Sequence, residues 1–102
     1  MREVLVRYKV KPDRVAENKE LVRAVYEELE TVGPSDFHYA TFLLDDGVSF
    51  VHVAYHGDGN PLATLPAFRR FLENIADRCD EPPVSTELSR VGSYRFAGSE
   101  PA

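Results

Sequence analysis

Histidine is the side chain best suited to proton transfer near neutral pH, and all the histidines of this chain fall in one short segment. His38, His52 and His56 lie within residues 36–57. An imidazole can act as a general base, as a metal ligand or as a packed core residue, and each role requires a different geometry. The segment is therefore the first place to look for a functional site.

The spacing of these histidines argues against a metal site. His52 and His56 are four residues apart, which on a strand separates them by roughly 13 Å. Zinc needs its ligand nitrogens about 2 Å from one ion, so this pair cannot chelate it. His38 could approach His52 diagonally, but no cysteine or carboxylate of the hairpin alternates onto that face. We expect no bound metal.

His52 is the strongest candidate for a catalytic residue. It lies in mid-strand between Val51 and Val53, where it should be at least half buried. A neutral buried imidazole can take a proton from a phenolic hydroxyl. The alternative is a core histidine that hydrogen-bonds a backbone carbonyl or the hydroxyl of Thr41. His56, at the strand end, is expected to be solvated.

Two further polar side chains could orient a ligand. Asn18 falls on the apolar stripe of a predicted helix, between Val15 and Val22, where an amide must be hydrogen-bonded. It could bind a ligand or bond a neighbouring backbone group. Tyr8, Tyr39 and Tyr55 could line a pocket, although tyrosines in strands usually serve packing. We take Asn18 and Tyr39 as candidate catalytic residues beside His52.

The elements that position these residues follow from the hydrophobic periodicity. Alternating residues 3–11 predict a strand, and three- and four-residue spacing over 14–30 predicts an amphipathic helix. The pattern then predicts strands over 37–44 and 48–56, a helix over 65–79 closed by Pro82 and Pro83, and a last strand over 84–96. This βαββαβ order indicates an α+β ferredoxin-like fold, an antiparallel sheet with two helices on one face. Residues 1–97 form one domain, and residues 98–102 are expected to be a disordered tail.

The turn of the hairpin decides which face carries each histidine. A two-residue turn at Asp46-Gly47 places His52 and His56 on one face and His38 on the other. A three-residue turn with a glycine bulge pairs Leu44 with Val48 and places all three histidines together. The second is preferred, because Gly47 then takes the left-handed position.

Both faces of the predicted hairpin are apolar. Val51, Val53 and Tyr55 point one way, and Phe50 and Ala54 point the other. The two helices can cover only one face of the sheet, so a second copy of the chain is expected to cover the other. The sequence therefore predicts a homodimer through the sheet.

Composition excludes several classes of partner. Of the 102 residues, 17 are acidic and 12 basic, which gives a net charge of −5. This excess disfavours nucleic acid and anionic membranes, which require a basic surface. No apolar stretch approaches bilayer length. A single cysteine, Cys79, suits a reducing cytoplasm and lies on an apolar stripe as a core residue.

Several stretches resemble the antibiotic biosynthesis monooxygenase superfamily. They are the hairpin FLLDDGVSFVH (42–52), the Pro-Ala-Phe opening of the second helix (66–68) and the terminal VGSYRF (91–96). The resemblance covers residues 2–96 and implies a dimeric α/β barrel with a small pocket between the sheet and the helices of each subunit. Some members of this superfamily oxidise phenols or quinols with molecular oxygen and no bound cofactor, and the resemblance implies the same expectation for this chain. The chain contains no tryptophan, which argues against the haem-degrading branch.

Three classes of function remain open on the sequence. The first is a cofactor-independent monooxygenase of a small aromatic substrate, with His52 as base and Asn18 and Tyr39 as orienting groups. The second is a non-catalytic protein that binds a small ligand. The third is a structural homodimer whose pocket is filled by side chains. An open cavity that reaches His52 would favour the first two.

Overall fold

The computed structural model describes residues 2–57 and 59–96, so the expected tail at 98–102 lies outside the described residues. Four strands and three α-helices follow one another along the chain. They are β1 (Arg2–Val10), α1 (Val15–Val32), β2 (Phe37–Leu43), β3 (Ser49–His56), α2 (Pro66–Leu72), α3 (Ile75–Arg78) and β4 (Cys79–Leu88), with short 3-10 helices at Pro12–Arg14 and Pro61–Thr64.

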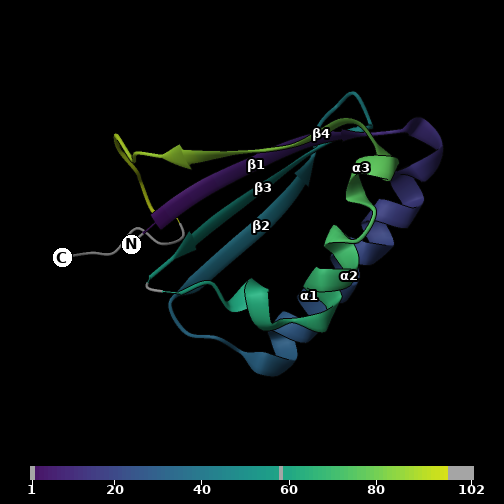
Figure 1. Ribbon diagram of the computed structural model, residues 1–102. Coiled ribbons are helices and arrows are strands. Elements are labelled where there is room, and N and C mark those ends of the chain that lie inside the picture. The colour runs from purple at the N-terminus through teal and green to yellow at the C-terminus, as the bar shows by residue number, and fades with distance from the viewer. Residues whose placement is uncertain (1, 58, 97–102) are drawn as a thin grey trace.

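The strands form one antiparallel sheet in the order β2-β3-β1-β4. All three α-helices lie on the same side of this sheet (Figure 1). The predicted α+β ferredoxin-like arrangement is therefore confirmed. Among the described residues, no helix combines the length and apolar character needed to cross a membrane.

Helix α1 packs its apolar stripe against the sheet and ends where its sequence predicts. Gly33 adopts a left-handed conformation with φ 58°, and its N–H donates to the carbonyl of Leu29. The stripe buries Val25, and it also buries Asn18 completely. Glu28 accepts a hydrogen bond from the N–H of Ala67 and so ties α1 to the first turn of α2.

The preferred register of the hairpin was wrong. Thr41 lies opposite His52 and Phe37 opposite His56, so His38 points to the other face. Gly47 is left-handed with φ 77°, as expected, but Leu44 pairs with Ser49 and not with Val48. The reason is Asp46, whose carboxylate accepts the N–H groups of Val48 and Ser49 and lengthens the loop by one residue.

The second helical region also differs from its prediction. Instead of one helix over 65–79, α2 ends at Leu72 and α3 begins at Ile75, because Asn74 adopts a left-handed conformation with φ 57°. Strand β4 then begins at Cys79 and includes Pro82 and Pro83, which were expected to precede it. Prolines are tolerated there because β4 is an edge strand with irregular pairing to β1.

The core lies between the sheet and the helices, and the other face of the sheet is uncovered within one chain. The buried cluster consists of Tyr8, Val10, Val25, Phe50, Leu62, Leu65, Ala67, Phe71 and Cys79. On the opposite face, Phe42 and Val84 keep 53% and 62% of their surface exposed. The helix-covered face is therefore the one that can hold a site within a single chain.

Candidate functional site

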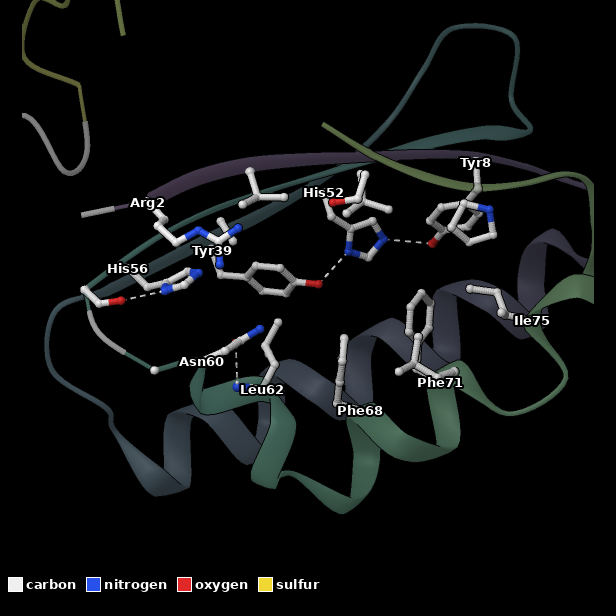
Figure 2. Close-up of a pocket in the computed structure, with 18 residues that line it drawn as sticks. Arg2, Tyr8, Tyr39, His52, His56, Asn60, Leu62, Phe68, Phe71 and Ile75 are labelled. Carbon is white, nitrogen blue, oxygen red and sulfur yellow. Dashed lines mark hydrogen bonds between the residues drawn. The ribbon is translucent and has the colours of Figure 1, made fainter. Parts of the chain in front are cut away.

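A cavity of about 510 Å³ lies between the sheet and the helical layer. Leu62, Phe68, Phe71 and Ile75 line it on the helical side, and Tyr39 and His52 project into it from β2 and β3 (Figure 2). Its walls are mainly aliphatic and aromatic, with a few polar groups. Such a cavity is suited to a small aromatic ligand.

His52 uses both of its ring nitrogens within the protein. Nε2 lies 2.8 Å from the hydroxyl of Tyr8, and Nδ1 lies 2.6 Å from the hydroxyl of Tyr39. The hydroxyl of Thr41 is a second neighbour of Nδ1, at 3.2 Å. Burial lowers the pKa of His52 to about 4, so the ring is neutral at pH 7.

The direction of the hydrogen bonds around His52 follows from a buried arginine. The guanidinium of Arg78 can only donate, and its Nε lies 3.3 Å from Oδ1 of Asn18. This contact orients the amide of Asn18, whose Nδ2 then donates to the hydroxyl of Tyr8 at 2.9 Å. Tyr8 therefore accepts from Asn18 and has its own proton available for Nε2 of His52.

The hydrogen bonds continue from Tyr8 through the imidazole of His52 to Tyr39 at the cavity. Because Nε2 of His52 accepts from Tyr8, the neutral ring carries its proton on Nδ1. Nδ1 then donates to the oxygen of Tyr39. The hydroxyl of Tyr39 lines the cavity and has the side chain of Thr41 as a further hydrogen-bond neighbour. The arrangement is a chain of donors that runs from Arg78 to the ligand space.

The reverse arrangement is less favourable. If Nε2 of His52 carried the proton, Tyr8 would accept from both Asn18 and His52, and its own hydroxyl proton would have no acceptor. Tyr8 is only 2% exposed, so that proton would be buried without a partner. Burial also raises the pKa values of Tyr8 and Tyr39, which keeps both as neutral hydroxyl groups.

Arg78 is the functional residue that sequence reasoning missed. It is 1% exposed, and within residues 2–57 and 59–96 no carboxylate forms an ion pair with it. Its charge is instead met by Asn18, by the carbonyls of Phe71 and Glu73, and by the ring of Phe71. The predicted continuous helix hid this position; only the break at Asn74 turns Arg78 inward.

The structure brings together some of the candidate residues and separates others. His52 and Tyr39 line the cavity and contact one another. Asn18 does not line it and reaches His52 only through Tyr8. His38 is exposed on the opposite face of the sheet.

His56 contradicts its prediction. It was expected to be solvated, but it is 6% exposed and lines the cavity, with the ring of Phe37 beside it. Its Nδ1 lies 2.8 Å from the carbonyl of Gly57. The strand end is thus covered by side chains that a strand pattern does not reveal.

A cluster of three or more metal-ligating side chains is absent from the part of the chain that the structure describes.

Comparison with solved structures identifies the fold. A structure named as an antibiotic biosynthesis monooxygenase superposes with a TM-score of 0.72 and 18% identity, over 90% of this chain and all of the other. A Nitrosomonas europaea protein provisionally given the same name has a TM-score of 0.71 and 20% identity, over 88% of this chain and 89% of the other. The chain therefore has the fold of the antibiotic biosynthesis monooxygenases, as the sequence resemblance implied.

The same comparison limits what the fold says about activity. An L-rhamnose mutarotase of Formosa agariphila also superposes, with a TM-score of 0.55 and 17% identity over 91% of this chain and 98% of the other. No protein-family model matches the sequence. No curated protein sequence matches it either. Because one fold hosts different chemistries, function has to be argued from the cavity.

Proposed function

We propose that the protein binds a small phenol or quinol in the cavity between sheet and helices and oxidises it with molecular oxygen. The observation that carries this proposal is the aromatic cavity whose polar wall is the hydrogen-bonded pair Tyr39 and His52. The likeness of the fold to antibiotic biosynthesis monooxygenases supports it. Tyr39 hydrogen-bonds an oxygen atom of the ligand, and His52 and Asn18 act as positioning residues behind it.

The proposed reaction needs no electron donor besides the substrate. A phenol with a free para position loses its O–H proton, and the electron-rich ring passes electrons to oxygen. One oxygen atom replaces the para hydrogen as a carbonyl, and the other leaves as water, so that phenol and O₂ become a quinone and H₂O. The four electrons that reduce O₂ all come from the ring. The protein contributes orientation, exclusion of water and proton transfer.

A second candidate is binding of the same ligands without chemistry. It is favoured by the lowered pKa of His52, because a buried imidazole whose pKa is about 4 is a poor proton acceptor at neutral pH. A purely structural role with a pocket filled by side chains does not fit the open cavity that reaches His52.

Oxygen consumption tests the catalytic proposal. The wild type is mixed with a panel of quinols and phenols in an oxygen electrode, with the uncatalysed autoxidation rate subtracted. Under ¹⁸O₂ the quinone should gain one labelled oxygen atom. Tyr39→Phe should lower kcat/KM by at least about tenfold, since it removes the hydrogen bond to that oxygen atom of the ligand. If the wild type consumes no oxygen but retains the ligand in equilibrium dialysis, the binding candidate replaces the enzyme.

We also propose that the protein is a homodimer through the uncovered face of its sheet. The apolar side chains on that face are Leu5, Phe42, Val51, Val53, Val84 and Leu88. The exposed fractions of Phe42 and Val84 leave a contiguous apolar surface on a single chain, which soluble proteins usually cover. A second copy, related by a two-fold axis, would bury this face against itself.

A further inference from the structure

His56 lies at one end of the cavity, away from the hydrogen-bond chain that runs through Tyr8. Figure 2 shows His56 beside Arg2 at that end, with Tyr8 and Ile75 at the other. The side chain is 6% exposed, so its ring faces the ligand space and not the solvent at large. The ring of Phe37 lies beside it, a contact that any aromatic side chain could make.

The tautomer of neutral His56 is determined by the backbone. A carbonyl oxygen can only accept, so the 2.8 Å contact with the carbonyl of Gly57 requires the proton on Nδ1. Nε2 then carries a lone pair. No hydrogen bond joins Nε2 of His56 to any side chain or backbone group in the described part of the chain. The ring therefore presents a free acceptor to the cavity.

His52, in contrast to His56, has no free acceptor nitrogen for a ligand. Its Nε2 lone pair is occupied by Tyr8, and its Nδ1 proton is directed at Tyr39. The buried charge of Arg78 holds this direction through Asn18. The polar group at this side of the cavity is the hydroxyl of Tyr39, which also has Thr41 as a neighbour and can turn its proton to an acceptor on a ligand.

We infer that His56, and not His52, is the group that takes the phenolic proton, and that Tyr39 donates to an acceptor oxygen elsewhere on the same ligand. The inference rests on the proposed function and specifies its substrate class. The ligand is an aromatic ring with a hydroxyl group toward His56 and a carbonyl or similar acceptor toward Tyr39. In the proton transfer the O–H bond breaks, an Nε2–H bond forms, and an imidazolium and a phenolate result. Arg2 lines the same end, but its guanidinium forms an ion pair with Glu87, so the phenolate is not assigned to it. The proton is later given to reduced oxygen and leaves as water.

A coloured phenol tests the proton transfer without any oxygen chemistry. 4-Nitrophenol carries a hydroxyl at one end and nitro oxygens, which are acceptors, at the other, and its anion is yellow. At a pH at which the free compound is neutral, the compound bound to the wild type should absorb as the anion. His56→Asn keeps a side-chain N–H for the carbonyl of Gly57 but removes the Nε2 acceptor. The compound bound to this variant should remain neutral.

Matched variants separate His56 from the rest of the site. Arg69→Leu, at an exposed position of α2 outside the cavity, should behave as the wild type. In the oxygen assay, His56→Asn should lower kcat by about 10²-fold or more, the usual weight of a general base, while the dissociation constant changes by less than tenfold. Added imidazole should restore part of the rate in His56→Ala, which loss of folding could not produce.

The outcomes distinguish this inference from the proposed oxidation. If the wild type ionises bound 4-nitrophenol but consumes no oxygen with any quinol, the assignment of His56 stands and the oxidation fails. The assignment is overturned if the bound compound is neutral in the wild type, or if it is ionised equally in His56→Asn. It is also overturned if His52→Ala abolishes ionisation and His56→Asn does not. If neither 4-nitrophenol nor any quinol binds to the wild type, both the proposed aromatic substrate and the assignment of His56 are overturned.

Discussion

The hydroxyl of Tyr8 lies 2.8 Å from Nε2 of His52, and both side chains are buried. Tyr8 lies near the end of β1 and His52 in the middle of β3, and the contact joins them diagonally on the helix-covered face of the sheet. Because Asn18 already donates to Tyr8, this contact determines which nitrogen of His52 carries the proton.

Nitrogen NMR of the imidazole can detect this tautomer. In the wild type at neutral pH, ¹⁵N chemical shifts should show His52 with its proton on Nδ1. In Tyr8→Phe the donor to Nε2 is lost, so the two tautomers should become mixed. The same change removes the hydroxyl that accepts from Nδ2 of Asn18 and donates to Nε2 of His52. It should therefore reduce the free energy of unfolding by about 1–3 kcal/mol. A wild-type spectrum with the proton on Nε2 would contradict the proposed direction of the chain.

The lowered pKa of His52 predicts a loss of stability in mild acid. Burial lowers the pKa from its ordinary 6.5 to about 4 in the folded state. Between these values the unfolded chain binds a proton that the folded protein does not, so stability is complete above pH 6.5 and falls as the pH approaches 4. The contribution that is lost is about 3 kcal/mol.

Urea unfolding at a series of pH values measures this effect. His52→Gln cannot titrate, so its free energy of unfolding should depend less on pH than that of the wild type across the same range. His38→Gln, on the opposite face of the sheet, serves as the matched histidine control; sedimentation should show that it assembles as the wild type does, and its pH dependence should follow the wild type. Equal pH dependence in the wild type and in His52→Gln would contradict the assignment.

Arg78 is expected to be important for stability although it forms no ion pair among the described residues. Arg78→Leu removes the donors that serve Asn18 and the carbonyls of Phe71 and Glu73, all within the buried layer. Leaving such acceptors unpaired should cost about 3 kcal/mol or more in the free energy of unfolding. Arg69→Leu, at an exposed position of α2, should change it by less than about 0.5 kcal/mol. Thermal or urea unfolding compares the two variants. A similar decrease in the free energy of unfolding for both would contradict a stabilising role of the Arg78 hydrogen bonds.

Val53→Asp tests the proposed dimer. Val53 lies on the uncovered face near the centre of β3, opposite Leu5 of β1. A carboxylate buried in an apolar interface is strongly unfavourable, so this variant should sediment as a soluble monomer while the wild type sediments at twice the chain mass of 11.5 kDa. Val32→Asp, at the exposed end of α1, should remain a dimer. A wild type that sediments at 11.5 kDa at low micromolar concentration would refute the dimer.

The order of elements and the place of His52 follow from local patterns in the sequence. Alternation of apolar and polar residues is a property of neighbouring positions, so it predicts β1, β2 and β3 and puts His52 in mid-strand. The same patterns failed from residue 72 onward. Asn74 adopts a left-handed conformation, and Pro82 and Pro83 are accommodated in an edge strand that pairs with distant β1; local periodicity predicts neither feature.

The hydrogen-bond polarity of the cavity was decided only by the tertiary structure. Asn18 was recognised as an amide that needs a partner, and Tyr39 as a tyrosine that could line a pocket. Their partners, however, come from residues 10 to 60 positions away along the chain: Asn18 bonds Tyr8 and Arg78, and Tyr39 bonds His52. A sequence states which groups can donate and accept, but the direction of each bond depends on which groups the folded chain brings within hydrogen-bonding distance of one another. The sequence therefore predicts His52 as the candidate base from its place in mid-strand, whereas only the folded chain leaves Nε2 of His56 as an acceptor beside the cavity.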